Sequence, residues 1–151
     1  MCGIIGILGN SPAVPRLMEG LRRLEYRGYD SAGVATLNNG QLDRRRASGK
    51  LSALDAVLAK NPLAGNSGIG HTRWATHGVP NTRNAHPHAS GERLALVHNG
   101  IIENHEELRH ELRDHGYHFN SDTDTEVMVH LIAQQMVSGL DLFSAMRKAV
   151  S

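Results

Sequence analysis

Cys2 is the only cysteine in the chain, and it directly follows Met1. Removal of Met1, which is usual before a small side chain, would leave Cys2 with a free α-amine. Such an amine has a pKa of about 7.7–8.0 and a thiol one of about 8.5, so the amine can take the thiol proton near neutral pH. The first residue would then supply both nucleophile and base. The alternative is that Cys2 is a small buried apolar side chain.

Asn99 and Gly100 follow a predicted strand and form a candidate oxyanion site. An Asn amide beside a glycine backbone N–H offers two donors to the oxygen that becomes charged when a nucleophile attacks a carbonyl. In other enzymes, removal of one such donor has cost about 2.7–4 kcal/mol. An Asn-Gly step is also a common turn signal, so the pair alone leaves both interpretations open.

Two charged residues are candidates for binding the ends of an amino acid. Arg73 ends a predicted strand within a polar segment at 71–78, and its guanidinium suits a carboxylate. A surface arginine stacked on Trp74 explains the same residues equally well. Asp124 suits an ammonium group, although an acidic residue at a helix start often only complements the helix dipole.

Ten histidines raise the possibility of a metal site, with His86 and His88 as the closest pair. A proline separates the two, no cysteine lies nearby, and no HExxH motif is present. We therefore expect no native metal and no cofactor, and keep a histidine-metal binding module only as an alternative. The basic run at 44–46 is short and follows an Asn-Gly turn, so we expect a solvated strand end.

Composition and charge restrict the function classes. Sixteen Lys+Arg against fifteen Asp+Glu give a net charge of +1, too little basic excess to favour nucleic acid as a partner. A single cysteine excludes an internal disulfide framework and suits a reducing cytoplasm. The apolar start has no basic segment before it, and no apolar run approaches the roughly 18 residues of a membrane span. We expect a soluble cytoplasmic protein without a membrane partner.

Intermixed strands and helices, with hairpins among them, must position these residues. Apolar runs and turn signals predict strands at 3–8, 32–37, 41–47, 67–72 and 94–97. Helical spacing predicts helices at 13–26, 51–60, 104–116, 123–136 and 141–150, with Thr123 and Glu126 as a capping box and Asp141 as a last cap. A long functional loop is expected between the fourth and fifth strands. This order predicts an α+β fold with sheets covered by helices.

Several motifs, in order along nearly the whole chain, resemble one family, glutamine:fructose-6-phosphate aminotransferase, in its glutaminase domain. Amidophosphoribosyltransferase is the runner-up, because it shares this domain with different versions of the motifs. The resemblance rests on Cys2-Gly3-Ile4, Glu25 to Gly33, the segments 71–78 and 85–88, His98 to Asn104, and Thr123 to Glu126.

The resemblance implies an N-terminal-nucleophile fold of two sheets between helices and a glutaminase mechanism. Cys2 would attack the glutamine carboxamide and form a thioester, with the oxyanion held by Asn99 and Gly100. The implied roles of the other residues are as follows: Arg73, Thr76 and His77 bind the α-carboxylate, Asp124 with Gly100 binds the α-ammonium, Trp74 gates ammonia, and Arg27 and Asp30 support Cys2.

The chain departs from the family in length. It stops at Ser151 within a predicted helix, so we expect 1–151 to be the first part of a truncated glutaminase domain. Later strands and two sugar-isomerase domains, which would bind fructose 6-phosphate and form most of a homodimer interface, are expected to lie outside it. An inactive fragment that only binds a partner is the remaining alternative.

Overall fold

A central four-stranded antiparallel sheet organises the molecule, which the computed structural model describes for residues 2–75 and 78–151. The strand order is β1-β4-β2-β3. The sequence predicts both ends of all four strands to within one residue. They are β1 Gly3–Ile7, β2 Ser31–Asn38, β3 Gln41–Ser48 and β4 Ser67–Arg73.

The turn between β2 and β3 confirms the hairpin prediction. Asn39 and Gly40 both have positive φ, 50° and 80°, as a two-residue turn that matches strand twist requires. Asn38 pairs with Gln41 on either side of it. The Asn-Gly step therefore sets the register of the whole hairpin.

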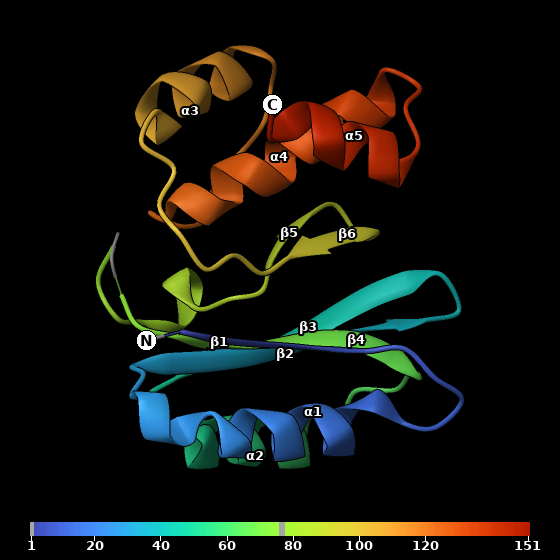
Figure 1. The fold of residues 1–151 in the computed structure, drawn as a ribbon, viewed down its shortest axis with the longest axis vertical. Helices are drawn as coiled ribbons and strands as arrows, with labels where there is room; N and C mark the ends of the chain where they lie inside the picture. The colour runs from blue at the N-terminus through green and yellow to red at the C-terminus, as the bar shows by residue number, and fades with distance from the viewer. Residues whose placement is uncertain (1, 76–77) are drawn as a thin grey trace.

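Two helices, α1 Ala13–Arg23 and α2 Leu51–Lys60, cover one face of this sheet (Figure 1). The apolar face of α1 supplies Leu17, Met18 and Leu21, which pack with Val34 of β2 and Leu54 of α2. The helix is shorter than the predicted 13–26, because the chain tightens into a 3₁₀ turn at Glu25–Arg27. The core between these helices and the sheet consists of aliphatic side chains.

A small hairpin and three helices lie over the opposite face (Figure 1). The hairpin pairs β5 His88–Ser90 with β6 Leu94–Leu96, and the helices are α3 His105–Asp114, α4 Asp124–Val137 and α5 Leu142–Ala149. The strand predicted at 94–97 is present, but it is only half-buried. The region predicted as one long loop contains β5 and a 3₁₀ turn at Thr82–Asn84. The sequence does not reveal these elements, because each is too short to produce a periodic pattern.

The predicted helix caps have different outcomes. Asp141 accepts a hydrogen bond from the Ser144 N–H at 3.0 Å, as expected for an N-cap. The capping box at Thr123 and Glu126 is wrong. The Glu126 carboxylate instead accepts from the backbone N–H groups of Asn120 and Ser121, at 2.9 and 2.7 Å. Glu126 thus fixes the segment before the helix rather than the cap.

The basic run at 44–46 is a second correction. Arg46 donates to the carbonyls of Arg83 and Ala85, at 3.0 and 2.9 Å, and Arg44 donates to the carbonyl of Pro87 at 2.9 Å. Burial lowers the pKa of Arg46 to about 10. These side chains fasten the 83–87 segment onto the sheet, a role that local sequence does not reveal.

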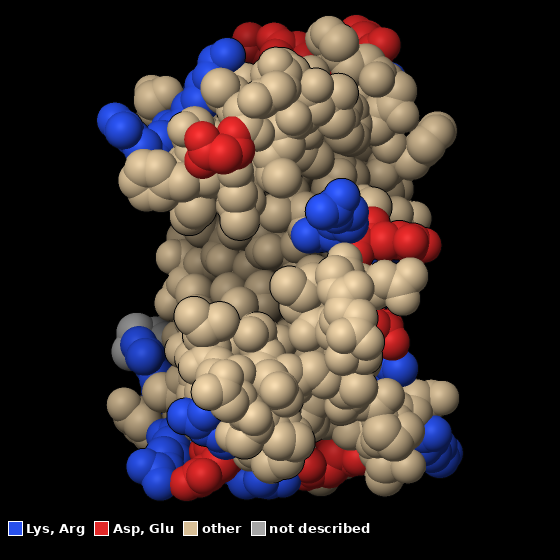
Figure 2. Space-filling model, turned by 90° about the vertical axis from the view of Figure 1, so that its right-hand side faces the viewer, with Lys and Arg blue, Asp and Glu red and all other residues tan. Residues whose placement is uncertain are grey.

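A hollow separates the two halves on one side of the molecule (Figure 2). A cavity of about 270 Å³ lies between the central sheet and the start of α5, lined mainly by uncharged residues such as Ala35, Leu37 and Leu94. Most charged side chains in this view lie toward the two ends. No helix among the described residues is both long and apolar enough to cross a bilayer.

Candidate functional site

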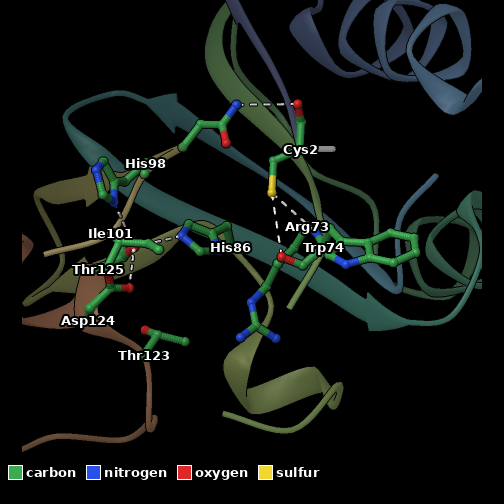
Figure 3. A pocket seen from close by; sticks show the side chains of 11 residues that line it. Cys2, Arg73, Trp74, His86, His98, Ile101, Thr123, Asp124 and Thr125 are labelled. Carbon is green, nitrogen blue, oxygen red and sulfur yellow. Dashed lines mark hydrogen bonds between the residues drawn. The ribbon is translucent and has the colours of Figure 1, made fainter. Parts of the chain in front are cut away.

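One pocket of about 250 Å³ collects residues from five separate segments of the chain (Figure 3). The segments are the residue before β1, the end of β4, the 86 region, the stretch after β6, and the first turn of α4. Its lining residues are Cys2, Arg73, Trp74, His86, His98, Asn99, Gly100, Ile101, Thr123, Asp124 and Thr125. The volume lies below the roughly 300–1,000 Å³ of pockets for drug-sized ligands. A ligand as small as one amino acid suits it.

Cys2 is held at one side of this pocket by strand pairing. Gly3 lies opposite Thr72 in the β1–β4 ladder, and its N–H donates to the Thr72 hydroxyl at 3.1 Å. The Cys2 sulfur accepts from the Trp74 N–H at 3.2 Å, and the thiol lies 3.6 Å from the Trp74 carbonyl oxygen. These two backbone contacts fix the position of the sulfur at the pocket wall.

Asn99 lies beside Cys2, although the two residues are 97 positions apart. Its side-chain amide donates to the Cys2 carbonyl oxygen at 3.3 Å. Asn99 and Gly100 are both exposed at the pocket wall. The Asn99 amide is thus close enough to Cys2 to donate a hydrogen bond to a ligand group that reacts with the sulfur.

Arg73 and Asp124 place opposite charges in the same pocket, and both are almost fully buried, at 3% and 4% exposure. One Asp124 carboxylate oxygen accepts from the Ile102 N–H at 2.9 Å. The Arg73 guanidinium donates to the Gly78 carbonyl at 3.3 Å. Burial lowers the Arg73 pKa, while the nearby Asp30, Cys2 and Asp124 act in the opposite direction. A cation and an anion are therefore available for a zwitterionic ligand.

Asp30 supports the end of β4 and lies outside the pocket lining. Its carboxylate accepts from the Ala75 N–H at 2.6 Å and the Ser31 hydroxyl at 3.0 Å. Its own N–H donates to the Arg73 carbonyl at 2.7 Å. Asp30 thus holds the backbone that carries Arg73 and Trp74.

Trp74 is 55% exposed, and its indole extends away from the side of the pocket formed by Asp124 and Thr125 (Figure 3). The ring packs over Gly28, where a Cβ atom would approach it to 3.1 Å. Arg27 belongs to the adjacent 3₁₀ turn and does not line the pocket. Thr76 and His77 lie outside the described residues.

Sequence reasoning gave no site role to several lining residues. His98, Thr123 and Thr125 flank predicted site residues within the same motifs, which was the available signal. His86 was considered only for metal binding. Its ring stacks on His71 at 4.2 Å between centroids and meets His88 edge-on at 4.7 Å. Within residues 2–75 and 78–151, no group of three or more His, Cys, Asp or Glu side chains is arranged to hold a metal ion.

The three neighbouring histidines, His71, His86 and His88, are electrostatically unusual. Burial lowers the pKa of His71 to about 4 and holds the pKa of His86 and His88 well below the ordinary value. Neighbouring positive groups lower these pKa values further, among them Arg73 and, for His88, Arg46. All three rings are neutral near pH 7, so they form an uncharged wall behind the pocket.

Solved structures with a similar fold support the predicted architecture. Glutamine phosphoribosylpyrophosphate amidotransferase from B. subtilis, in complex with ADP and GMP, matches 99% of this chain and 32% of its own chain, with a TM-score of 0.78 and 28% identity. A structure described as the allosteric regulatory enzyme of purine biosynthesis matches equally well at 29% identity. The predicted N-terminal-nucleophile fold, helices enclosing two sheets, is confirmed.

Sequence comparison gives closer relatives. Glutamine–fructose-6-phosphate aminotransferase (isomerizing) of Zymomonas mobilis is 59% identical over 150 residues, and that of Caulobacter vibrioides is 62% identical over 148. These alignments cover 99% and 96% of this chain but 24% of each relative, so the chain spans about a quarter of their length. The model of the glutamine amidotransferase domain matches residues 58–147. The chain therefore belongs to the glutamine amidotransferase domain family.

Proposed function

We propose that this domain hydrolyses glutamine to glutamate and ammonia with Cys2 as the nucleophile. The observation that carries the proposal is the single pocket that contains the Cys2 sulfur, the Asn99 amide, the Arg73 guanidinium and the Asp124 carboxylate. Arg73 binds the α-carboxylate of glutamine and Asp124 its α-ammonium. The side-chain carboxamide then extends toward Cys2.

The reaction proceeds in two balanced steps. The Cys2 thiolate attacks the carboxamide carbon, and the developing oxyanion is stabilised by the Asn99 amide and the Gly100 N–H. The C–N bond breaks and the nitrogen leaves as ammonia after protonation, which gives a thioester. Water then attacks the thioester with the same oxyanion stabilisation, releasing glutamate and the thiol.

The α-amine of Cys2 acts as the base once Met1 has been removed. While Met1 is attached, the Cys2 nitrogen is an amide and cannot take a proton. With Met1 gone, its pKa of about 7.7–8.0 suits proton exchange with the thiol and the departing ammonia. Thr76 and His77 are proposed to assist Arg73, Trp74 to limit the escape of ammonia, and Arg27 and Asp30 to support the site.

For the native protein we propose that the ammonia acceptor is fructose 6-phosphate, giving glucosamine 6-phosphate. The 57–62% identity to enzymes named for that substrate supports this over phosphoribosyl pyrophosphate, whose amidotransferase is 28% identical. Fructose 6-phosphate binding and dimerisation are assigned to parts of the native protein beyond residues 1–151. We also propose a cytoplasmic location without nucleic-acid or membrane partners, supported by the lone cysteine and the small net charge.

Steady-state release of glutamate by the native-length protein tests the glutaminase step. Cys2→Ala should lower the rate of glutamate release by about a thousandfold or more, because the nucleophile is lost. Arg73→Lys should raise KM for glutamine about tenfold, because lysine cannot make a bidentate contact. A residue before Cys2 that is not removed should inactivate the enzyme. Glutamate release at the wild-type rate by Cys2→Ala would refute the proposal.

A second assay separates the two acceptors. The native-length protein is supplied with glutamine and either fructose 6-phosphate or phosphoribosyl pyrophosphate. We expect an amino sugar phosphate only with fructose 6-phosphate. Product formed only with phosphoribosyl pyrophosphate would favour the alternative assignment while leaving the glutaminase step intact.

A further inference from the structure

Thr125 is a buried hydroxyl in the pocket to which the proposed reaction assigns no role. It is the second residue of α4 and only 1% exposed. Its Oγ1 lies 3.0 Å from His86 Nε2, 3.3 Å from His98 Nδ1 and 3.5 Å from an Asp124 carboxylate oxygen. One hydroxyl thus connects three chain segments that line the pocket.

The hydrogen-bond capacity of a hydroxyl matches these three neighbours. A threonine hydroxyl donates once and accepts twice. His86 is neutral because burial keeps its pKa low, and its Nδ1 has no hydrogen-bond partner among the described residues. A proton on Nδ1 would be buried without an acceptor, so the stable tautomer carries it on Nε2 and donates it to Thr125. The threonine proton is then directed toward His98 or Asp124.

These two recipients hold opposite ends of the proposed substrate site. Asp124 is held at its other carboxylate oxygen by the Ile102 N–H at 2.9 Å, so Thr125 is its second anchor. His98 directly precedes Asn99, whose amide contacts the Cys2 carbonyl. Loss of the hydroxyl would leave Asp124 with the Ile102 N–H as its remaining anchor and would remove the contact at His98 Nδ1. Displacements of about 1 Å strongly reduce catalysis.

We propose that Thr125 is a positioning residue whose hydroxyl sets Asp124 relative to His98 and Asn99, and so fixes the distance between the α-ammonium site and the oxyanion site. This proposal rests on the proposed glutaminase function. Thr125 acts through its neighbours and makes no direct contact with the reacting atoms. His86 serves as the rigid support from which the hydroxyl is oriented.

Two matched pairs of side chains isolate the hydroxyl in the native-length, Met1-free protein. The first pair is threonine and valine, because Thr125→Val keeps the shape of the side chain and removes the hydroxyl. The second pair is Thr125→Ser, which keeps the hydroxyl, and Thr125→Ala, which lacks it. This second pair carries the test should the valine variant fail to fold. We expect valine and alanine to lower kcat/KM for glutamine about tenfold, mainly through KM, and serine to remain within about threefold of wild type. Alkylation of Cys2 by iodoacetamide should be unchanged, because Cys2 is held by Trp74.

A double-mutant cycle distinguishes positioning from a general structural effect. In an Asp124→Asn background, the loss caused by Thr125→Val should shrink to about threefold or less, because the anchored charge is already absent. Wild-type kinetics for Thr125→Val, or equal losses for serine and alanine, would overturn the proposal. If the wild type is active and the variants give these results, only the positioning role of Thr125 is refuted. If the wild type is inactive, the glutaminase function and the role of Thr125 are refuted together.

Discussion

The two faces of the central sheet are built by different physical means. On one face, α1 and α2 bury a core of aliphatic side chains such as Leu17, Leu21 and Leu54. On the other face, the buried layer toward α4 contains histidines, arginines and Glu126, joined by hydrogen bonds between distant segments. The pocket opens on this second side. The difference between the two faces indicates that burial of the aliphatic layer stabilises the fold. Burial of the polar layer costs part of that free energy, but its hydrogen bonds orient the site.

Acidification should have the largest effect of the changes considered, and it should destabilise the polar layer more than the aliphatic layer. The pKa of His71 falls from 6.5 to about 4 on folding, so between those pH values the unfolded chain binds the proton first. Stability is therefore full above about pH 6.5 and decreases as the pH falls toward 4, by about 1.4 kcal/mol per pH unit for each histidine shifted in this way. The total from His71 alone approaches about 3 kcal/mol. The groups that face these histidines include Arg44, Arg46, Arg73 and His98.

Urea unfolding between pH 7 and pH 5 measures this slope while most carboxylates remain ionised. Hydrogen exchange should show that α4 loses protection before α1, because the aliphatic core, as far as the structure describes it, contains no histidine or carboxylate. Stability independent of pH over this range, or NMR titration of His71, His86 and His88 near pH 6.5 in the folded protein, would contradict the buried, neutral state of the cluster.

Gly33→Ala should damage the contact between the layers without altering the aliphatic core. A Cβ atom at Gly33 would lie 2.1 Å from the His86 carbonyl oxygen, which is backbone and cannot move aside alone. We expect a loss of about 3 kcal/mol in the free energy of unfolding and a raised KM for glutamine. Gly6→Ala is the matched control, because a Cβ there meets nothing within 4 Å. Equal effects of the two substitutions would remove the steric explanation.

Arg46→Met tests the fastening of the 83–87 segment. It removes two charge-assisted hydrogen bonds to the carbonyls of Arg83 and Ala85, and we expect a loss of about 2 kcal/mol in chemical unfolding. Arg23→Met removes an exposed i,i+4 pair with Glu19 and should cost less than about 0.5 kcal/mol. A loss at Arg46 as small as that at Arg23 would mean that the strand end is solvated after all.

Sequence reasoning predicted one layer much better than the other. Helical spacing of Leu17 and Leu21 and the Asn39-Gly40 turn are local signals. The elements they specify lie within one residue of the predicted bounds, apart from the end of α1. The errors lie in the polar layer, where Arg46 and Glu126 bond to backbone groups remote from any local pattern. The grouping of Cys2, Arg73, Asn99 and Asp124 in one site follows from the family resemblance and not from hydrophobic periodicity, and the structure places all four in one pocket. Thr125 was missed because two of its three contacts, to His86 and His98, come from other parts of the chain.

Asp141→Ala should have a smaller effect than the substitutions at Gly33 and Arg46. It removes the cap that accepts from the Ser144 N–H at the start of α5, on the exposed edge of the helical layer. We expect a loss of about 1 kcal/mol in thermal unfolding, with unchanged KM for glutamine. A large change in KM would show that α5 is coupled to the pocket more tightly than these contacts indicate.

We propose that Cys2 is the nucleophile of a glutamine-binding pocket. The most direct test of this role treats the native-length, Met1-free protein with a glutamine analogue that carries an electrophilic carbon in place of the carboxamide, followed by intact mass and peptide mapping. We expect one adduct per chain, located on Cys2, formed more slowly in excess glutamine and absent in Cys2→Ala. An adduct on another residue, or glutamate release from a protein that never labels at Cys2, would contradict it.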